Sequence, residues 1–350
     1  MKKKYKVFSL AESDKWNEYY DRIEGKDKDI YYTSSIINAF EKFENTQALL
    51  FIYEEDENLA YYPFFKRTID GSNYFDITTQ FTYGGPLFKI NSNSEEFIDN
   101  FRSAFGDYCR EDGIISELIR FHPFINSNLL LDGYVEIKVV NNGIFMDLDK
   151  TEIEIVNNYH PKVNYQIKKA TQNGCKVIFS KNLKDLDYFF SIYEHTMERN
   201  NANNSFYFLN KEFLQLLLEQ LKNNFEFVFI EKEGVYVSTG LILFSEQYAN
   251  TVIGGTLKEY FKFHPHRLLR HALSLSYLNK SQTKLILGTG VSMDDSIFDY
   301  KKRFNPNGEY KFLMGMKIHD EEKYNELVKK RQEIYPDKEL NPNYFPLYRS

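Results

Sequence analysis

A basic segment in the last third of the chain has the residue types needed to bind a phosphate group. Pro265 stands where the first turn of a helix is expected, and the free backbone N–H groups of such a turn suit an anion. The same segment carries a run of cationic and histidine side chains: Lys258, Lys262, His264, His266, Arg267, Arg270 and His271. A phosphate-binding helix start and a solvated helix face both fit this pattern.

A second group of polar side chains lies on or just after the strand expected at residues 114–121. Arg120 and His122 are two positions apart, so they share one face of an ideal strand and could both reach a ligand at its end. Glu117 is three positions from Arg120 and faces the other side. A buried structural arginine is the rival interpretation of Arg120.

A glycine turn, Tyr83-Gly84-Gly85-Pro86, precedes this strand in the sequence. Because glycine has no Cβ, Gly84 and Gly85 would let a substrate approach the backbone closely. A tight turn without any ligand explains the same residues.

The bulk composition narrows the class of function. The chain has 350 residues and 42% hydrophobic residues, an ordinary globular balance that is long enough for two domains. The net charge of −6 argues against a protein whose whole surface coats nucleic acid, but it leaves room for a local basic groove. The two cysteines, Cys109 and Cys175, form neither a metal-binding spacing nor a disulfide framework.

Targeting segments and cofactor motifs are not expected in this sequence. The basic N-terminus is not followed by an apolar stretch, and apolar runs such as residues 214–218 are far too short to cross a bilayer. Zinc-protease, nucleophile-elbow and Walker motifs are missing. We therefore expect a cytoplasmic protein that holds no metal and no resident cofactor.

The elements that must position these residues follow one order twice. Each half reads strand, helix, helix, three antiparallel strands, a Gly-Gly turn, helix and strand. In the first half the strands are expected at residues 5–10, 48–55, 59–68, 74–81 and 114–121, and the helices at 13–23, 34–43 and 94–110. A further strand is expected near 134–148. The second half has strands at 175–180, 225–232, 237–244, 249–254 and 283–290, and helices at 161–174, 183–199, 211–223 and 265–279.

This element order matches the acetyltransferase-like (GNAT) fold, in which two central strands splay apart and hold an acyl donor between them. We expect an α/β (α+β) protein of two tandem GNAT domains, with mixed, mostly antiparallel sheets flanked by helices. Residues 1–150 form the acceptor-side domain and residues 151–317 the donor-side domain, and the helix and tail at 318–350 pack back on the first. Two unrelated α/β domains are the alternative.

Several segments resemble the bacterial FemAB family of peptidoglycan aminoacyltransferases, and they are spread in order over nearly the whole chain. These segments are residues 60–67, 83–86, 120–123, 167–170, 196–200, 254–256, 287–290, 300–304 and 344–349. The resemblance implies transfer of an amino acid from aminoacyl-tRNA to an amine of a peptidoglycan precursor. The implied partners are aminoacyl-tRNA, a cell-wall precursor or nucleotide sugar, and, by peripheral contact, a membrane-bound lipid-linked acceptor.

The resemblance also implies roles for individual residues. Lys301 lies in Tyr300-Lys301-x-x-Phe304, which is similar to the family's Phe-Lys-x-x-Phe, so it is the first catalytic candidate and would stabilise the oxyanion. Glu117 is the second. The acceptor would be bound by Arg199, Tyr207, Tyr83, Gly84, Gly85, Arg120 and His122. The donor would be bound by Gly254, Gly255, His264, Arg267 and Arg270. For Lys301 a solvated basic run, and for Arg199 a pairing with the helix dipole, are the structural alternatives.

Two departures from the family pattern keep a second function open. The aspartate that some members carry after the Gly-Pro of the first half is absent, because Leu87, Phe88 and Lys89 follow Pro86. The long coiled-coil arm of some members is absent too. The alternative is an acyl-CoA-dependent N-acyltransferase that acts on an amino sugar of a surface polysaccharide. The Gln/Arg-x-x-Gly-x-Gly/Ala signature of coenzyme A binding is missing at residues 264–270, which favours the tRNA donor. A non-catalytic binding domain is the third reading.

Overall fold

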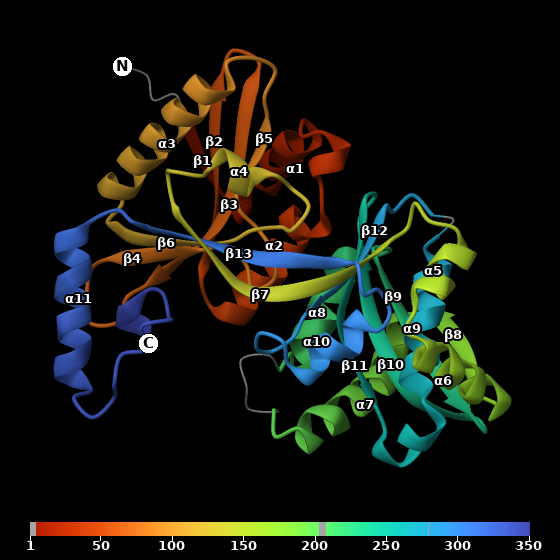
Figure 1. Ribbon diagram of the computed structural model, residues 1–350. Coiled ribbons are helices and arrows are strands. Elements are labelled where there is room, and N and C mark those ends of the chain that lie inside the picture. Colours follow the sequence, from red (N-terminus) through yellow and green to blue (C-terminus); the bar gives the residue numbers. More distant parts are fainter. Residues whose placement is uncertain (1–4, 203–207, 279) are drawn as a thin grey trace. The chain divides into compact units, whose positions relative to one another are not determined.

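The computed structural model describes residues 5–202, 208–278 and 280–350, and these residues form two compact units (Figure 1). The first unit comprises the chain up to Asp27 together with Tyr31–Val140 and Phe312–Ser350. The second comprises Lys28–Ile30 and Asn141–Lys311. The domain boundaries expected at residues 150 and 317 stay a prediction. The compact units are not continuous in sequence, because Lys28–Ile30 belongs to the second unit and Phe312–Ser350 to the first. Tyr207 lies outside the described residues.

The first unit is a sheet with helices on both faces. Its strands run in the order β1-β2-β3-β4-β6-β13, and β5 pairs with β3. The elements are β1 (Tyr5–Ser9), α1 (Ser13–Asp21), α2 (Ser34–Glu44), β2 (Gln47–Glu55), β3 (Asn58–Thr68), β4 (Phe75–Thr78), β5 (Leu87–Lys89), α3 (Ser94–Glu111), β6 (Ile114–Arg120), α4 (Ser127–Leu130), β13 (Glu309–Ile318) and α11 (Glu321–Ile334).

Aromatic residues at two different periods hold α3 on this sheet. Phe97, Phe101 and Phe105 are four apart, so they line one side of the helix, and all three are buried. Phe51 and Tyr53 alternate along β2 and meet them, with ring centroids of Phe51 and Phe105 5.0 Å apart. The two-residue period of the strand and the four-residue spacing of the helix therefore each form an apolar face, and these two faces pack against each other.

The second unit has the same plan. Its strands run in the order β7-β12-β11-β10-β9-β8. The elements are β7 (Glu136–Asp147), α5 (Glu152–Asn158), α6 (Pro161–Gln172), β8 (Lys176–Ser180), α7 (Leu186–Arg199), α8 (Lys211–Leu221), β9 (Phe225–Lys232), β10 (Val235–Phe244), β11 (Tyr248–Thr256), α9 (Pro265–Ser276), β12 (Lys284–Thr289) and α10 (Ser296–Lys302).

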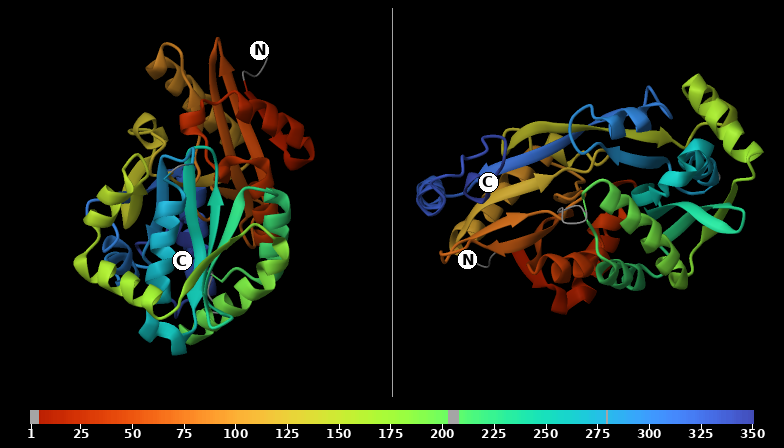
Figure 2. Two further views of the ribbon diagram at one scale, coloured as in Figure 1. Left: turned by 90° about the vertical axis from the view of Figure 1, so that its right-hand side faces the viewer. Right: turned by 90° about the horizontal axis from the view of Figure 1, so that it is seen from below.

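Helices cover both faces of this second sheet, as Figures 1 and 2 show. Val228 of β9 and Leu269 of α9 belong to one core cluster with residues of α6. The next residue along the strand, Phe227, points to the opposite face and stacks with Phe189 of α7 at 5.2 Å. The sheet thus lies between α6 and α9 on one side and α7 on the other.

The two sheets exchange their last strands. The strand after β6 in the sequence is β7, but its residues Gly143–Asp147 pair with β12 of the second unit. The strand after β12 is β13, and its residues Met314–Ile318 pair with β6 of the first unit. The sequence placed the strand near 134–148 in the first half, so the exchange is a feature that the element order alone did not predict.

No helix in the described parts of the chain is long and apolar enough to cross a membrane.

Candidate functional site

The central parallel strands of the second unit separate partway along their length. β11 and β12 pair over three positions, from Tyr248 opposite Lys284 to Asn250 opposite Ile286. At the next position the Thr251 hydroxyl donates to the backbone carbonyls of Ile286 and Leu287, at 3.2 and 3.3 Å. Beyond that point β11 continues to Thr256 without further pairing to β12 among the described residues, and its residues 251–255 are partly or fully exposed.

The equivalent strands of the first unit stay together. β4 and β6 pair from Phe75 to Thr78, and the pairing extends through a hydrogen bond from Thr79 N to Leu118 O and a bridge between Gly84 and Phe121. The splay that the fold uses to hold an acyl donor is thus a feature of the second unit.

Lys301 lies at the end of β12, where the strands have separated. Its Nζ donates to the Thr289 carbonyl at 2.7 Å, and a Cβ at Gly288 would lie 3.4 Å from it. The residue is partly exposed, yet burial of its ammonium group, with the charge of Arg270, lowers the pKa of Lys301 to about 7. A lysine that changes charge near neutral pH suits both oxyanion stabilisation and proton transfer.

Asp295 fixes the helix that carries Lys301. It is the N-cap of α10, and its carboxylate accepts hydrogen bonds from the backbone N–H groups of Ile297 and Phe298 at 2.9 and 2.8 Å. The same carboxylate accepts from Val291 and Ser292 in the preceding loop. Sequence reasoning missed Asp295, although an Asp directly before a helical apolar pattern is an N-cap signal.

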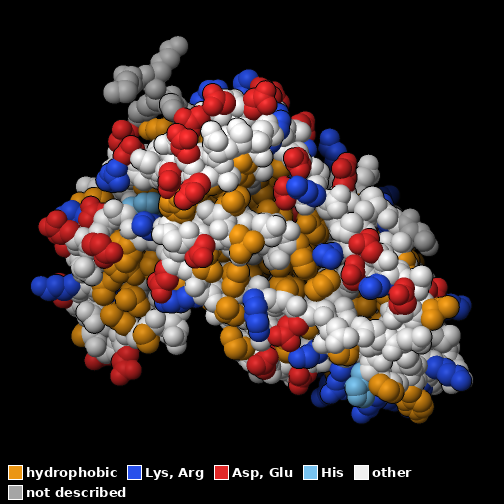
Figure 3. All heavy atoms as spheres, turned by 45° about the horizontal axis from the view of Figure 1, so that its top comes forward, with side chains coloured by type: hydrophobic (Ala, Val, Ile, Leu, Met, Phe, Trp, Pro, Cys, Tyr) orange, Lys and Arg blue, Asp and Glu red, His pale blue; other side chains and the backbone are white. Residues whose placement is uncertain are grey.

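The basic segment does not form one exposed cationic face. Lys258 and Lys262 are exposed, but Arg267 is 6% exposed and stacks over the Tyr300 ring at 4.3 Å. Burial, and the neighbouring arginines, lower the pKa of His266 to about 4, so it is neutral at pH 7. On the face in Figure 3, acidic and basic side chains are interspersed.

The start of α9 differs from a glycine-rich phosphate loop. His264 occupies the position before Pro265 with a φ of +56°, a conformation that glycine adopts most easily. Its ring contacts that of His266, and Phe261 contacts His266 in turn. Aromatic and imidazole rings thus crowd the helix start, where the sequence had suggested phosphate binding.

Packing explains the glycines of β11. A Cβ at Gly255 would lie 2.5 Å from Thr196 Oγ1 and 2.7 Å from the Ile192 carbonyl of α7. A Cβ at Gly254 would lie 2.4 Å from the Thr239 carbonyl of β10. Glycine is therefore required here for close helix and strand approach, with or without a donor.

Arg199 joins the end of α7 to the end of β11. Its Nη1 donates to the Thr256 carbonyl at 2.9 Å, and its guanidinium lies 4.9 Å from the centre of the Phe261 ring. The residue is partly exposed. It is therefore near the open end of the splayed strands, and a role in acceptor binding stays a proposal.

Glu117 in the first unit is held in a buried ion pair. Its carboxylate accepts from Arg102 at 2.8 and 3.1 Å and from the Tyr62 hydroxyl at 2.8 Å, and His319 Nε2 lies 3.1 Å away. Burial alone would raise the pKa of Glu117, but Arg102 and His319 outweigh it and hold the pKa well below its usual range. With every oxygen engaged and no exposure, this geometry gives Glu117 a structural role rather than a catalytic one.

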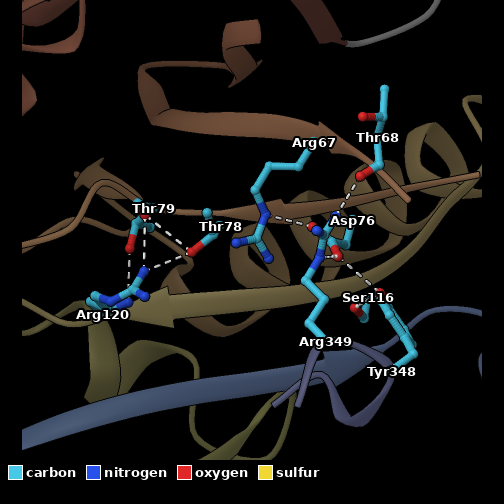
Figure 4. Close-up of polar contacts among 9 residues, drawn as sticks. All are labelled: Arg67, Thr68, Asp76, Thr78, Thr79, Ser116, Arg120, Tyr348 and Arg349. Carbon is cyan, nitrogen blue, oxygen red and sulfur yellow. Dashed lines mark hydrogen bonds and ion pairs between the residues drawn. The ribbon is translucent and has the colours of Figure 1, made fainter. Parts of the chain in front are cut away.

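Arg120 is likewise engaged by its own sheet (Figure 4). Its Nη1 donates to Thr78 Oγ1 at 2.7 Å and to the Thr79 carbonyl at 3.1 Å. In the same view, the buried Asp76 accepts from Arg67 at 2.7 Å and from Arg349 of the C-terminal segment at 2.5 Å. This second network ties the chain end to the sheet of the first unit.

The Tyr83–Pro86 turn is buried. Tyr83 packs edge-on against His122 at 5.3 Å, and His122 Nδ1 accepts from the backbone N–H of Phe124 at 3.2 Å. A Cβ at Gly84 would lie 2.6 Å from the Thr79 side chain, and Gly85 has a φ of +102°. Close packing and backbone conformation account for both glycines, so the tight-turn interpretation fits better than substrate approach.

Comparison with known proteins agrees with this architecture. Residues 158–302 match the family model described as an acetyltransferase (GNAT) domain, and no curated protein matches the chain. The crystal structure of FemX is 11% identical and superposes with a TM-score of 0.70, covering 91% of this chain and 99% of that chain.

Two further solved structures share the fold. L-PGS from Bacillus licheniformis is 11% identical, with a TM-score of 0.54 over 93% of this chain and 97% of that chain. A tandem GNAT protein from the clavulanic acid biosynthesis pathway is 7% identical, with a TM-score of 0.51 over 90% of this chain and 98% of that chain. The predicted tandem acetyltransferase-like fold is confirmed. The chain is therefore a GNAT acyltransferase-fold protein of two tandem units, and its acetyltransferase domain indicates an acyltransferase enzyme.

Proposed function

We propose that the protein transfers an amino acid from aminoacyl-tRNA to an amine of a peptidoglycan precursor. The observation that carries the proposal is the splay of β11 and β12 with Lys301 Nζ at its end. The likeness to FemX over 91% of the chain supports it. Because aminoacyl-tRNA is made in the cytoplasm, we place the protein there.

The chemistry requires positioning and charge stabilisation rather than a covalent intermediate. The acceptor amine attacks the ester carbonyl carbon, which forms the C–N bond and a tetrahedral oxyanion. Collapse of that intermediate breaks the ester C–O bond, and one proton passes from the amine to the leaving ribose oxygen. With a pKa near 7, Lys301 can hold positive charge beside the oxyanion and donate a proton to the leaving group.

The start of α9 supports a tRNA donor over free coenzyme A. Coenzyme A binding in this fold relies on glycines whose backbone N–H groups face the pyrophosphate. Here His264 takes that position, and Arg267 is buried against Tyr300 rather than extended towards a phosphate. The exposed Lys258 and Lys262 remain for contacts with the tRNA backbone, which need no base recognition.

Arg199 is the arginine that we assign to the acceptor. It sits at the open end of β11, and an arginine suits the phosphate of a nucleotide-sugar or lipid-linked precursor. A lipid-linked acceptor would bring the protein to the membrane surface by peripheral contact. Tyr207 keeps its proposed acceptor role, outside the described residues.

The test is donor binding by the purified protein, with charged tRNA and acetyl-CoA titrated separately at one salt concentration. The proposal expects saturable binding of aminoacyl-tRNA that exceeds binding of the uncharged tRNA. Binding of acetyl-CoA alone would refute it and favour the second candidate, a coenzyme A-dependent N-acyltransferase of amino sugars. That candidate draws support from the same splay, which can hold either donor.

A Lys301→Met variant and a matched Lys302→Met control test whether Lys301 takes part in the transfer. Lys302 is the adjacent residue, is partly exposed, and pairs with Glu309 at 3.0 Å. Both variants are compared at saturating donor, so that the rate reports the action of Lys301 on the reacting ester. Transfer should be lost only when Lys301 is replaced.

A further inference from the structure

We infer that Arg270 and Lys301 together form a receptor for a permanent oxyanion, a phosphate or carboxylate group carried by a substrate of the transfer. The inference rests on the proposed function for the identity of that substrate. Neither the basic-segment pattern nor the family resemblance pairs these two residues.

The helices that carry the two cations are packed together. The Tyr300 hydroxyl of α10 donates to the His266 carbonyl of α9 at 3.0 Å, and Arg267 Nη1 lies 3.4 Å from the Tyr300 carbonyl. Lys301 follows Tyr300, and Arg270 lies one turn after His266 on the same side of α9. Beyond the effect of burial, the positive charge of Arg270 also lowers the pKa of Lys301, in keeping with this packing.

Two arginines of α9 have buried donors that no acceptor among the described residues satisfies. Nε and Nη1 of Arg270 are both buried, and neither has a hydrogen-bond partner within the described residues. Nε of Arg267 is also buried without a partner there, and the residue is 6% exposed. A buried donor without an acceptor destabilises the fold, and more so when it is charged. Such a cost is expected where a ligand supplies the acceptor.

No protein carboxylate is placed to fill this role among the described residues around Lys301. Asp295 is the carboxylate whose charge acts on Lys301, and backbone N–H groups of the α10 cap and the loop before it occupy its oxygens. Besides burial, the positive charges of Arg303 and Arg270 both act on Arg267 and lower its pKa. His266 contributes none at neutral pH, because its pKa is lowered to about 4. Within the described parts of the chain, the positive charges of the arginines therefore outnumber the one carboxylate, Asp295, that acts on Lys301.

An oxyanion is the ligand chemistry that satisfies both residues. A guanidinium offers paired donors to two oxygens of one phosphate or carboxylate, and an ammonium adds a third contact. The proposed reaction offers two kinds of oxyanion: a phosphate, of the tRNA donor or of a nucleotide-sugar or lipid-linked acceptor, and a carboxylate of the peptide acceptor. Both place a permanent negative charge beside the reacting ester, and the bound anion would keep Lys301 protonated.

The test follows the Lys301 amine by NMR in protein labelled with [ε-13C]lysine, and the signal lost in Lys301→Arg identifies it. Inorganic phosphate and acetate are titrated separately, with chloride keeping the ionic strength constant. At least one of them should raise the pKa of Lys301 by about one unit or more, equivalent to about tenfold tighter binding to the charged amine. A response to phosphate alone assigns the receptor to a phosphate-bearing substrate, and a response to acetate alone assigns it to the peptide carboxylate.

Variants at position 270 decide whether the arginine belongs to the receptor. Arg270→Gln should abolish the anion-induced shift, whereas the Lys302→Gln control should retain it. If Arg270→Gln does not fold, Arg270→Lys keeps the charge without the paired donors and should weaken anion binding. A Lys301 pKa that neither anion changes would overturn the inference, as would an equal response in the position-270 variants. Phosphate and acetate can bind whether or not the protein transfers an amino acid. If the protein binds these anions but not tRNA, the inferred receptor stands and the proposed tRNA donor is refuted.

Discussion

Replacing Lys301 with methionine should stabilise the second unit while it removes the proposed oxyanion stabiliser. The pKa of Lys301 is lowered from 10.5 to about 7 in the folded protein, chiefly by burial. The unfolded chain therefore binds more protons than the folded chain between pH 7 and pH 10.5. In that window the wild-type free energy of unfolding rises with pH, and the methionine variant lacks this rise.

The size of the effect follows from the two pKa values. At pH 7 the shifted amine costs the fold about 4 kcal/mol relative to a neutral side chain, and at pH 9 about 2 kcal/mol. Partial exposure of Lys301 lets water reduce both figures, so they are upper limits. Loss of the hydrogen bond to the Thr289 carbonyl offsets about 1 kcal/mol at either pH. The variant should thus be more stable by up to about 3 kcal/mol at pH 7.

The assay is urea unfolding of both proteins at pH 7 and pH 9, followed by circular dichroism. Fluorescence of Trp16, the single tryptophan, reports the first unit and serves as the internal reference. The stability difference between variant and wild type should shrink by about 2 kcal/mol between the two pH values. The claim that Lys301 is buried and partly neutral would be refuted if the difference in free energy of unfolding did not change with pH. It would also be refuted if the variant were less stable than the wild type at pH 7.

Three further substitutions test the packing and the ion pairs. Gly255→Ala should destabilise the protein by about 1–3 kcal/mol in thermal unfolding, because the new Cβ meets backbone of α7, and an unchanged melting temperature would contradict that contact. Glu117→Gln should cost about 3–5 kcal/mol at pH 7 by leaving Arg102 buried without its partner. Since the pKa of Glu117 is lowered from 4.5, the extra stability of the wild type over Glu117→Gln is fully present above pH 4.5 and should diminish on acidification. Unfolding of both proteins, measured over an acid pH series, would show this loss. Arg349→Ala should expose the C-terminal segment to limited proteolysis, because Asp76 would lose its ion pair with the chain end and keep only the hydrogen bond from Tyr348 there. An unchanged cleavage pattern would show that the ion pair does not secure the chain end.

The repeated element order was predictable because it depends on local periodicity. Alternation in the strands and four-residue spacing in the helices are visible in the sequence, and the structure shows both halves with the same order. The exchange of β7 and β13 was not predictable, because alternation shows that a strand forms but not which sheet it joins. The three-residue strand β5 was too short to give a pattern.

The candidate site was predictable only in part. Lys301 came from a resemblance, and its position beside the splayed strands depends on contacts between β12 and α10. Glu117 looked catalytic because Arg102 and His319, its partners, are 15 and 202 residues away in the sequence. The basic segment suggested an exposed face, but Arg267 turns inward to stack on Tyr300, a residue of another helix. Tertiary partners, which no local pattern contains, decided each of these outcomes.

The most direct test of the account is the rate of aminoacyl transfer from charged tRNA by the wild type, Lys301→Met and the Lys302→Met control. The account predicts that Lys301→Met lowers the rate at saturating substrate by about 10²-fold or more, as expected for one lost oxyanion stabiliser, while the control stays close to wild type. Equal rates for wild type and Lys301→Met would contradict the placement of the reaction at the splayed strands of the second unit.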